Sequence, residues 1–111
     1  MELRKELLEI KCPVGITQNI ISGKWKLVIL WELKSGTKRF NELQRGLSFI
    51  RQGYLTQQLR ELERDGLVHR EVYKEVPPKV EYSLTEIGTK FLTVIDSMYN
   101  WGEEYIKLLQ E

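Results

Sequence analysis

The chain has 111 residues, of which 41% are hydrophobic and 30% charged, and its formal net charge is +1. This length fits one domain with a single core, and it is too short for a two-lobed enzyme with a deep cleft between the lobes. One cysteine and one histidine exclude an intrachain disulfide and a cluster of soft zinc ligands, so we expect no metal and no cofactor.

The first predicted element is a short helix over residues 2–10, with Leu3 and Leu7 among its apolar positions. Cys12 and Pro13 end it, because a residue before proline is disfavoured in the α region. The segment is charged and lacks the apolar core of a secretory signal, and no apolar run reaches the roughly 18 residues of a membrane span. We therefore expect a cytoplasmic protein without membrane association.

A second helix is predicted from about Ile16 to Ser35, with Gly36 just beyond its end. Its apolar residues cover nearly every helical face, which is typical of a helix at the centre of a domain. A short helix follows in "RFNELQRGL" and ends near Gly46. We expect Asn41 to cap this helix and Gln44 to complete a capping box.

The fourth helix is predicted over about residues 52–65, where Leu55, Leu59 and Leu62 recur at helical spacing. Gly66 marks its end. The period then changes, because "LVHREVYK" and "VEYSL" are rich in β-branched and aromatic residues and Pro77-Pro78 separates them. This pattern predicts a hairpin over about residues 68–84, with a loop near Glu75 to Lys79.

The last and longest predicted helix spans about residues 85–110, with Thr85 as its cap and an apolar stripe along its length. The complete order is helix, helix, short helix, helix, hairpin and long helix. That order predicts a mainly α fold with a small β-hairpin (α+β). It is a winged helix-turn-helix in a single domain, residues 1–111, with additional N- and C-terminal helices.

Several polar residues of the helix predicted over about residues 52–65 are suited to reading DNA. Spacing of 100° per residue places Gly53, Gln57, Arg60 and Arg64 opposite the leucines, with Gln52 and Thr56 on one flank. Glutamine can pair with an adenine edge and arginine with guanine, and cations at the hairpin tip, Lys74 and Lys79, can reach a neighbouring groove or phosphates.

Charge is also distributed unevenly, because residues 38–79 hold nine basic and six acidic side chains, whereas residues 80–111 hold two basic and six acidic ones. This asymmetry favours a polyanion as the partner of the middle segment. Together with the groove-reading side chains of residues 52–64, it leads us to expect double-stranded DNA as that partner. Two alternatives stay open at this point. The helix face is simply solvated, or the chain is a winged-helix module that binds another protein and no DNA.

Five segments carry a resemblance to a known family: "GKWKLVIL", "RFNEL", "LTQQLRELERDGLVHR", "PPKVEYSLTEIG" and "WG". Through them the chain resembles the HxlR-type winged helix-turn-helix transcriptional regulators of bacteria, from Cys12 to Gly102. The resemblance implies a homodimeric DNA-binding regulator, with residues 53–64 as recognition helix, residues 72–82 as wing, and the terminal helices as dimer interface. We expect this regulator to be a repressor of transcription.

The start of the recognition helix departs from the family pattern, because a Gly-Ile-Ser type of sequence is replaced by Phe49, Ile50 and Arg51, and Gly53 stands where a basic residue is common. We expect Arg51 to replace the missing basic contact and Gly53 to allow close approach to a phosphate. The complete predicted DNA-binding set is Arg39, Arg51, Gln52, Gly53, Thr56, Gln57, Arg60, Arg64, Lys74 and Lys79.

A homodimer would read an inverted repeat with half-sites one DNA turn apart, about 34 Å. We predict that large apolar residues of the terminal helices form its interface, although they could also pack within one chain. These residues are Leu3, Leu7, Phe91, Ile95, Met98, Trp101 and Tyr105.

Cys12 stands at the position where some HxlR-type regulators carry a thiol that senses electrophiles or oxidants, so the resemblance implies a sensor. Lys11 beside it favours the reactive thiolate. The alternative is an inert, partly buried thiol, and the identity of any small-molecule or electrophile effector stays open. The sequence contains no Ser-His-Asp set, glycine-rich phosphate loop or metal motif, so we expect that the chain is not an enzyme.

Overall fold

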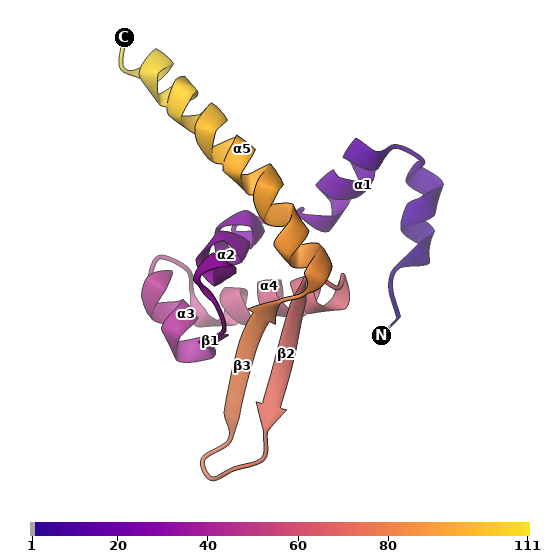
Figure 1. Ribbon diagram of the computed structural model, residues 1–111, viewed down its shortest axis with the longest axis vertical. Coiled ribbons are helices and arrows are strands. Elements are labelled where there is room, and N and C mark those ends of the chain that lie inside the picture. Colours follow the sequence, from indigo (N-terminus) through magenta and orange to yellow (C-terminus); the bar gives the residue numbers. More distant parts are fainter. Residues whose placement is uncertain (1) are drawn as a thin grey trace.

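The computed structural model describes residues 2–111 and has the element order of a winged helix-turn-helix (Figure 1). The prediction of a mainly helical fold with a small sheet is therefore confirmed. A three-stranded antiparallel sheet with strand order β1-β3-β2 lies against the helices. The elements are η1 (Lys5–Ile10), α1 (Pro13–Ile20), α2 (Lys26–Glu32), η2 (Leu33–Ser35), β1 (Lys38–Arg39), α3 (Phe40–Gly46), α4 (Gln52–Arg64), β2 (Val68–Tyr73), β3 (Lys79–Leu84) and α5 (Glu86–Leu109).

The core lies between α2, α3, α4 and the sheet, and it is built mainly from leucine and isoleucine. Leu55, Leu59 and Leu62 of α4 are fully buried, as their helical spacing predicts. Ile29 and Leu30 of α2 are buried beside them. The amphipathic α4 is therefore fixed by one face, which leaves its other face free for solvent or a partner.

The predicted helix from Ile16 to Ser35 is wrong, because the chain forms two helices there, α1 and α2, separated by residues 21–25. Gly23 has φ +152, a conformation that favours glycine, and a Cβ at this position would collide with the side-chain oxygen of Gln58. The apolar residues cover every face because two helices of different direction contribute them. Pro13, which ends the first segment, also opens α1 at its first helical position.

The segment around α3 also differs from the prediction. Lys38 and Arg39 form a two-residue strand that pairs with Tyr82 and Glu81 of β3, and a strand this short leaves no alternating pattern in the sequence. Arg39, not Asn41, is the N-cap of α3, and its backbone N–H donates to Glu42 Oε1 at 2.8 Å. The Gln44 Nε2 group donates instead to the carbonyl of Ile50 at 2.6 Å.

Thr85, between the wing and α5, caps the last helix as the sequence predicts. The Thr85 hydroxyl accepts from the Gly88 N–H at 3.1 Å and donates to the Gly66 carbonyl at 2.6 Å. Gly88 packs directly on the backbone of Leu67, where a Cβ would collide with the carbonyl oxygen. These contacts join the start of α5 to the turn that follows α4.

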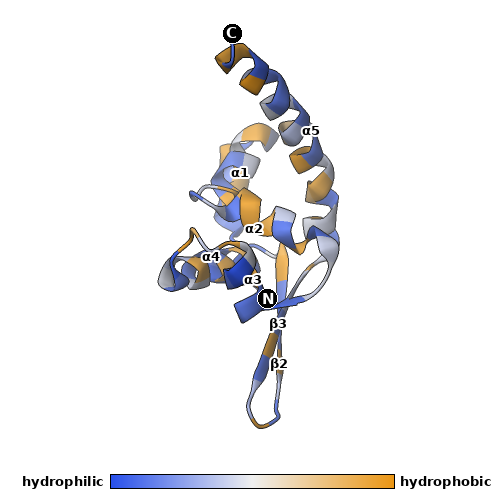
Figure 2. Ribbon diagram, turned by 90° about the vertical axis from the view of Figure 1, so that its left-hand side faces the viewer, coloured by the Kyte–Doolittle hydropathy of each residue, from blue (hydrophilic) through white to orange (hydrophobic). Residues whose placement is uncertain are grey.

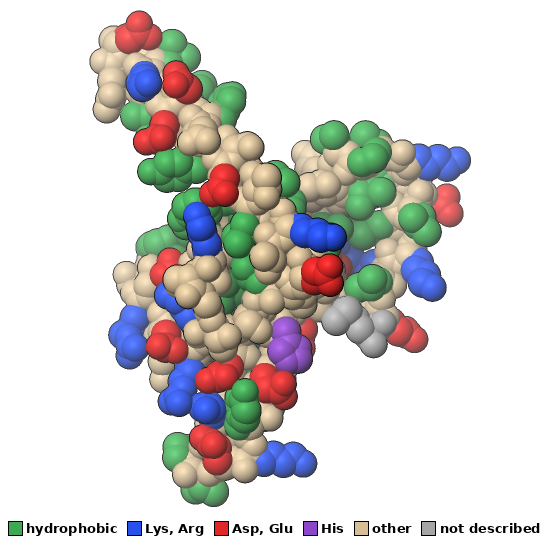
Figure 3. Space-filling model, in the orientation of Figure 1, with side chains coloured by type: hydrophobic (Ala, Val, Ile, Leu, Met, Phe, Trp, Pro, Cys, Tyr) green, Lys and Arg blue, Asp and Glu red, His purple; other side chains and the backbone are tan. Residues whose placement is uncertain are grey.

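Helix α5 divides into a packed half and a projecting half (Figures 1 and 2). Ile95 is buried at 6% exposure and Phe91 packs against the core beside it. Beyond them, Met98, Trp101 and Tyr105 are exposed, and Figure 3 shows hydrophobic side chains along this projecting end. Among the described residues, none of the helices combines the length and apolar character that crossing a membrane requires.

Candidate nucleic-acid interface

The exposed face of α4 carries the residues that helical spacing places opposite the leucines. Gln52, Gly53, Gln57, Arg60 and Arg64 are all exposed, and Thr56 is half-buried toward the sheet. The Thr56 hydroxyl donates to the Gln52 carbonyl at 2.9 Å, so this hydroxyl already has an acceptor inside the helix. The side chains of Gln57 and Arg60 therefore give this face most of its capacity to read a base edge.

The first turn of α4 begins at Arg51, whose backbone is extended and whose side chain forms no capping hydrogen bond. The absence of a serine cap thus leaves the first N–H groups of the helix without a side-chain partner. A Cβ at Gly53 would meet nothing within 4 Å. Packing does not require this glycine, and the helix start presents bare backbone to the outside.

A recess separates α4 from the sheet on the side of the wing. It is lined by Thr56, Arg60 and Glu63 of α4 and by Arg70 and Tyr82 of the sheet. The recess brings Arg60 toward strands β2 and β3, so α4 and these strands border one continuous surface. Both elements can therefore contact one bound duplex.

A second recess lies between the start of α3 and the wing loop, lined by Arg39, Phe40 and Asn41 and by residues 75, 77–80. Lys79 borders it and is partly engaged, because its Nζ lies 3.7 Å from Glu81 Oε2 and 4.5 Å from the ring centre of Tyr73. Lys74 on the wing is exposed. The structure thus places Arg39 beside the wing, although the two are 40 residues apart in sequence.

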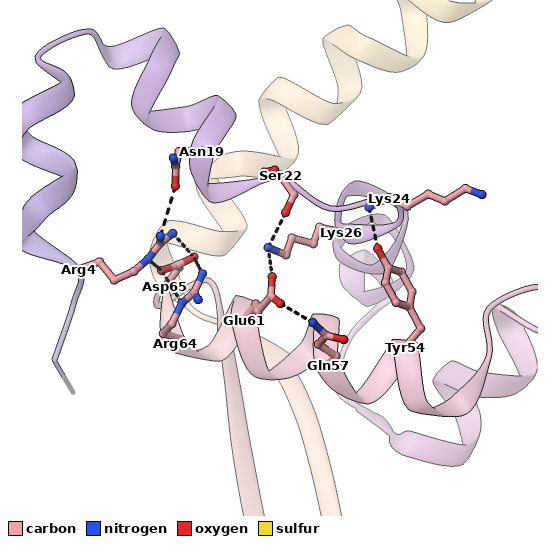
Figure 4. Close-up of polar contacts among 10 residues, drawn as sticks. All are labelled: Arg4, Asn19, Ser22, Lys24, Lys26, Tyr54, Gln57, Glu61, Arg64 and Asp65. Carbon is pink, nitrogen blue, oxygen red and sulfur yellow. Dashed lines mark hydrogen bonds and ion pairs between the residues drawn. The ribbon is translucent and has the colours of Figure 1, made fainter.

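Arg64 differs from Arg60, because its guanidinium pairs with the next residue, Asp65, at 2.9 and 3.2 Å (Figure 4). Arg4 of the N-terminal segment donates two hydrogen bonds to the same carboxylate, from its Nε at 2.9 Å and its Nη2 at 3.0 Å. Burial of Asp65, whose side chain is 3% exposed, raises the pKa of its carboxyl, but the hydrogen bonds from Arg4 and Arg64 outweigh this and hold the pKa below its usual range. The exposed guanidinium of Arg64 therefore already has an ionic partner within the protein.

A buried lysine on α2 contacts α4 from the inside. The side chain of Lys26 is 2% exposed, and its Nζ lies 2.6 Å from Glu61 Oε1 and donates to the Ser22 carbonyl at 2.8 Å (Figure 4). The other oxygen of Glu61 accepts from Gln57 Nε2 at 3.2 Å. The hydrogen bond from Lys26 lowers the pKa of the Glu61 carboxyl. Sequence reasoning missed Lys26, Glu61, Asp65 and Arg4, and the one local signal was a lysine inside the apolar run "KWKLVIL".

Cys12 is exposed at the N-terminus of α1, between η1 and the helix. Arg4, eight residues before it, connects this N-terminal segment to the end of α4 through Asp65. The predicted interface residues Leu3, Met98, Trp101 and Tyr105 are exposed, Leu7 and Phe91 are half-buried, and Ile95 belongs to the core. Ile95 thus offers no surface to a partner in this conformation. Within residues 2–111 there is no group of three or more side chains suited to hold a metal ion.

Comparison with known proteins places the chain in a family. The model of the HxlR-like helix-turn-helix family matches residues 20–110. The chain is 60% identical over 94 residues to the uncharacterized HTH-type transcriptional regulator YdeP of Bacillus subtilis strain 168, which covers 85% of this chain and 73% of YdeP.

Solved structures of the redox regulator HypR are also similar. Its reduced form matches with a TM-score of 0.83 and 50% identity, over 89% of this chain and 98% of HypR. Its oxidized form matches with a TM-score of 0.77 and 54% identity, over 84% and 96% of the two chains. With the fold, the exposed face of α4 and the family match in agreement, the chain belongs to the HxlR-like helix-turn-helix family of transcriptional regulators.

Proposed function

We propose that the protein is a sequence-specific DNA-binding repressor of transcription that acts in the cytoplasm as a homodimer on an inverted-repeat operator. The observation that carries this proposal is the exposed face of α4, where Gln52, Gly53, Gln57 and Arg60 lie beside the wing. A helix held by its leucines with amides and a guanidinium outward is suited to the major groove. The basic residues 39, 51, 74 and 79 surround it and suit phosphates.

The competing function is a winged-helix module that binds another protein, and salt dependence separates the two. We expect binding to a duplex selected from a random pool to weaken steeply with salt, because each phosphate contact contributes a slope of about −0.9 in log affinity against log salt. Arg60→Ala should weaken binding by about 1–3 kcal/mol if Arg60 contacts a base. Fluorescence anisotropy at several salt concentrations measures both quantities.

Lys90→Ala is the matched control, because Lys90 is an exposed cation on α5 that pairs only loosely with Glu86 at 3.9 Å. Its affinity for the selected duplex should stay within about twofold of the unsubstituted protein, since exposed pairs contribute little. An affinity for DNA that stays the same from low to physiological salt would contradict the proposal and favour the protein-binding alternative. A complete lack of DNA binding would do the same.

We also propose that the regulator responds to thiol modification at Cys12. The exposure of the thiol supports this, and so does the contact of Arg4 with Asp65, which connects the N-terminal segment to the end of α4. HypR, a redox regulator with reduced and oxidized structures, supplies the comparison. An exposed thiol on a segment joined to the recognition helix can transmit its chemical state to DNA binding.

Diamide treatment tests this thiol response. We expect full oxidation of Cys12 to change the affinity for the selected duplex at least tenfold, and a reductant to restore it. Cys12→Ser should bind normally and ignore diamide, which controls for other damage. Unchanged binding at complete thiol oxidation, measured by mass spectrometry on the same sample, would refute the sensor.

A further inference from the structure

Lys26 is buried in the interior, where an ammonium group is costly unless charged or polar partners surround it. Its two partners are the Ser22 carbonyl at 2.8 Å and the Glu61 carboxylate at 2.6 Å. Replacing both members of such a buried ion pair by apolar residues is often neutral or stabilising, so stability of the core does not by itself require the pair of Lys26 and Glu61. The lysine is therefore better explained by what it does to Glu61 than by core packing.

Glu61 connects the interior to the exposed face of α4, because its two oxygens have different partners. Oε1 faces Lys26 and Oε2 accepts from Gln57 Nε2 at 3.2 Å (Figure 4). A deprotonated carboxylate has no hydrogen to donate, so Gln57 must turn its NH₂ group toward Glu61. Its amide oxygen and the second N–H are then left for a partner outside the protein.

We propose that Lys26 and Glu61 are positioning residues that set the base preference of Gln57, with adenine favoured over guanine at one position of each half-site. This rests on the proposed function. Adenine presents an N6 donor beside the N7 acceptor in the major groove, which matches the free oxygen and free N–H of Gln57. Guanine presents two acceptors, N7 and O6, so the fixed amide oxygen of Gln57 would face another oxygen.

Lys26 sets the donor and acceptor direction of each hydrogen bond from position 26 through position 61 to Gln57, because an ammonium group can only donate. With glutamate at position 61, both carboxylate oxygens accept, and the NH₂ of Gln57 is turned inward. With glutamine at position 61, the amide oxygen must face Lys26, and its NH₂ must face Gln57. The Gln57 amide then reverses and presents its own NH₂ outward, toward the acceptors of guanine.

Glu61→Gln therefore gives a reversal that loss of structure cannot imitate. The experiment selects bound duplexes from a random pool with the unsubstituted full-length protein and with Gln57→Ala, which identifies the position that Gln57 reads. Anisotropy titrations then compare adenine with guanine at that position. We expect the unsubstituted protein to favour adenine at least tenfold, and Glu61→Gln to abolish or reverse this preference while discrimination at the other positions stays the same.

Two further variants complete the test. Glu103→Gln makes the same chemical change at an exposed position of α5 and should leave the adenine preference intact. Lys26→Met removes the donor that orients position 61, so adding it to Glu61→Gln should bring the ratio of adenine to guanine affinity to within about threefold of one. Thermal unfolding of each variant shows whether it is folded.

The outcomes separate this proposal from the function on which it rests. If the unsubstituted protein selects no sequence, the proposed function fails. If it selects an operator, but Gln57→Ala leaves the selected sequence unchanged or Glu61→Gln keeps the adenine preference, the positioning role is overturned while DNA binding stands. A Glu61→Gln variant that loses affinity equally for all sequences also overturns it, because the role would then be structural only.

Discussion

Replacing Trp101 with glutamate is expected to separate the proposed homodimer and to weaken binding to its proposed operator by a factor on the order of 10² to 10⁴. Trp101 is 67% exposed on the projecting half of α5 and stacks on Tyr105 with ring centres 5.2 Å apart. Large exposed aromatic residues are typical of the centre of an interface, and a buried unpaired carboxylate there is costly. A monomer loses the gain in effective concentration that links two half-sites.

Light scattering coupled to size exclusion measures the mass of the Trp101→Glu protein, and anisotropy measures its binding to one or two half-sites. Affinity for a single half-site should be unchanged, because α4 and the wing are distant from Trp101. Thr93→Glu places the same charge on an exposed position of the same helix and should remain dimeric. A Trp101→Glu protein that keeps its dimeric mass would show that this part of α5 is not the interface.

Replacing Gly88 with alanine is expected to destabilise the fold by about 2 kcal/mol. The new Cβ would collide with the backbone carbonyl of Leu67, which no side-chain rotation can relieve. Overpacking costs about 1–3 kcal/mol, and the cost here should not lie at the lower end, because the colliding atoms of Leu67 belong to the backbone. Against this cost, alanine gains at most about 1 kcal/mol in helix propensity.

Urea unfolding at one fixed protein concentration measures the free energy of unfolding of Gly88→Ala. Gly53→Ala is the matched control, because it makes the same change in a helix where the new Cβ meets nothing within 4 Å. That variant should be stabilised by up to about 1 kcal/mol. Equal changes in the free energy of unfolding of the two variants would contradict this prediction. They would mean that the backbone of Leu67 shifts to accommodate the new Cβ without loss of stability.

The sequence predicted the parts of this fold whose information is local. Helical spacing of Leu55, Leu59 and Leu62 identified both the buried side of α4 and its exposed side. Thr85 was recognised as a cap because capping depends on the next three residues. The sequence did not predict the two-residue strand β1, because this strand exists only through pairing with β3, more than 40 residues later.

The division between α1 and α2 was missed for a related reason. A helix that is apolar all round and two successive apolar helices have the same composition, and the break at residues 21–25, where Gly23 has a positive φ, becomes visible only in the structure. The candidate site shows the same limit. Gln57 and Arg60 could be placed on the outside from spacing alone, whereas the contact of Lys26 with Glu61 joins residues of different helices and depends on how α2 crosses α4.

The carboxylate of Asp65 has a mechanical consequence. The guanidinium groups of Arg4 and Arg64 share this one carboxylate, whose side chain is 3% exposed, although Arg4 lies 61 residues before Asp65 in the sequence. Arg4 cannot move away from the C-terminal end of α4 without leaving the buried carboxylate with one guanidinium partner instead of two, which is costly where water has little access. Movement of the N-terminal segment would therefore leave the buried carboxylate of Asp65 to Arg64 alone.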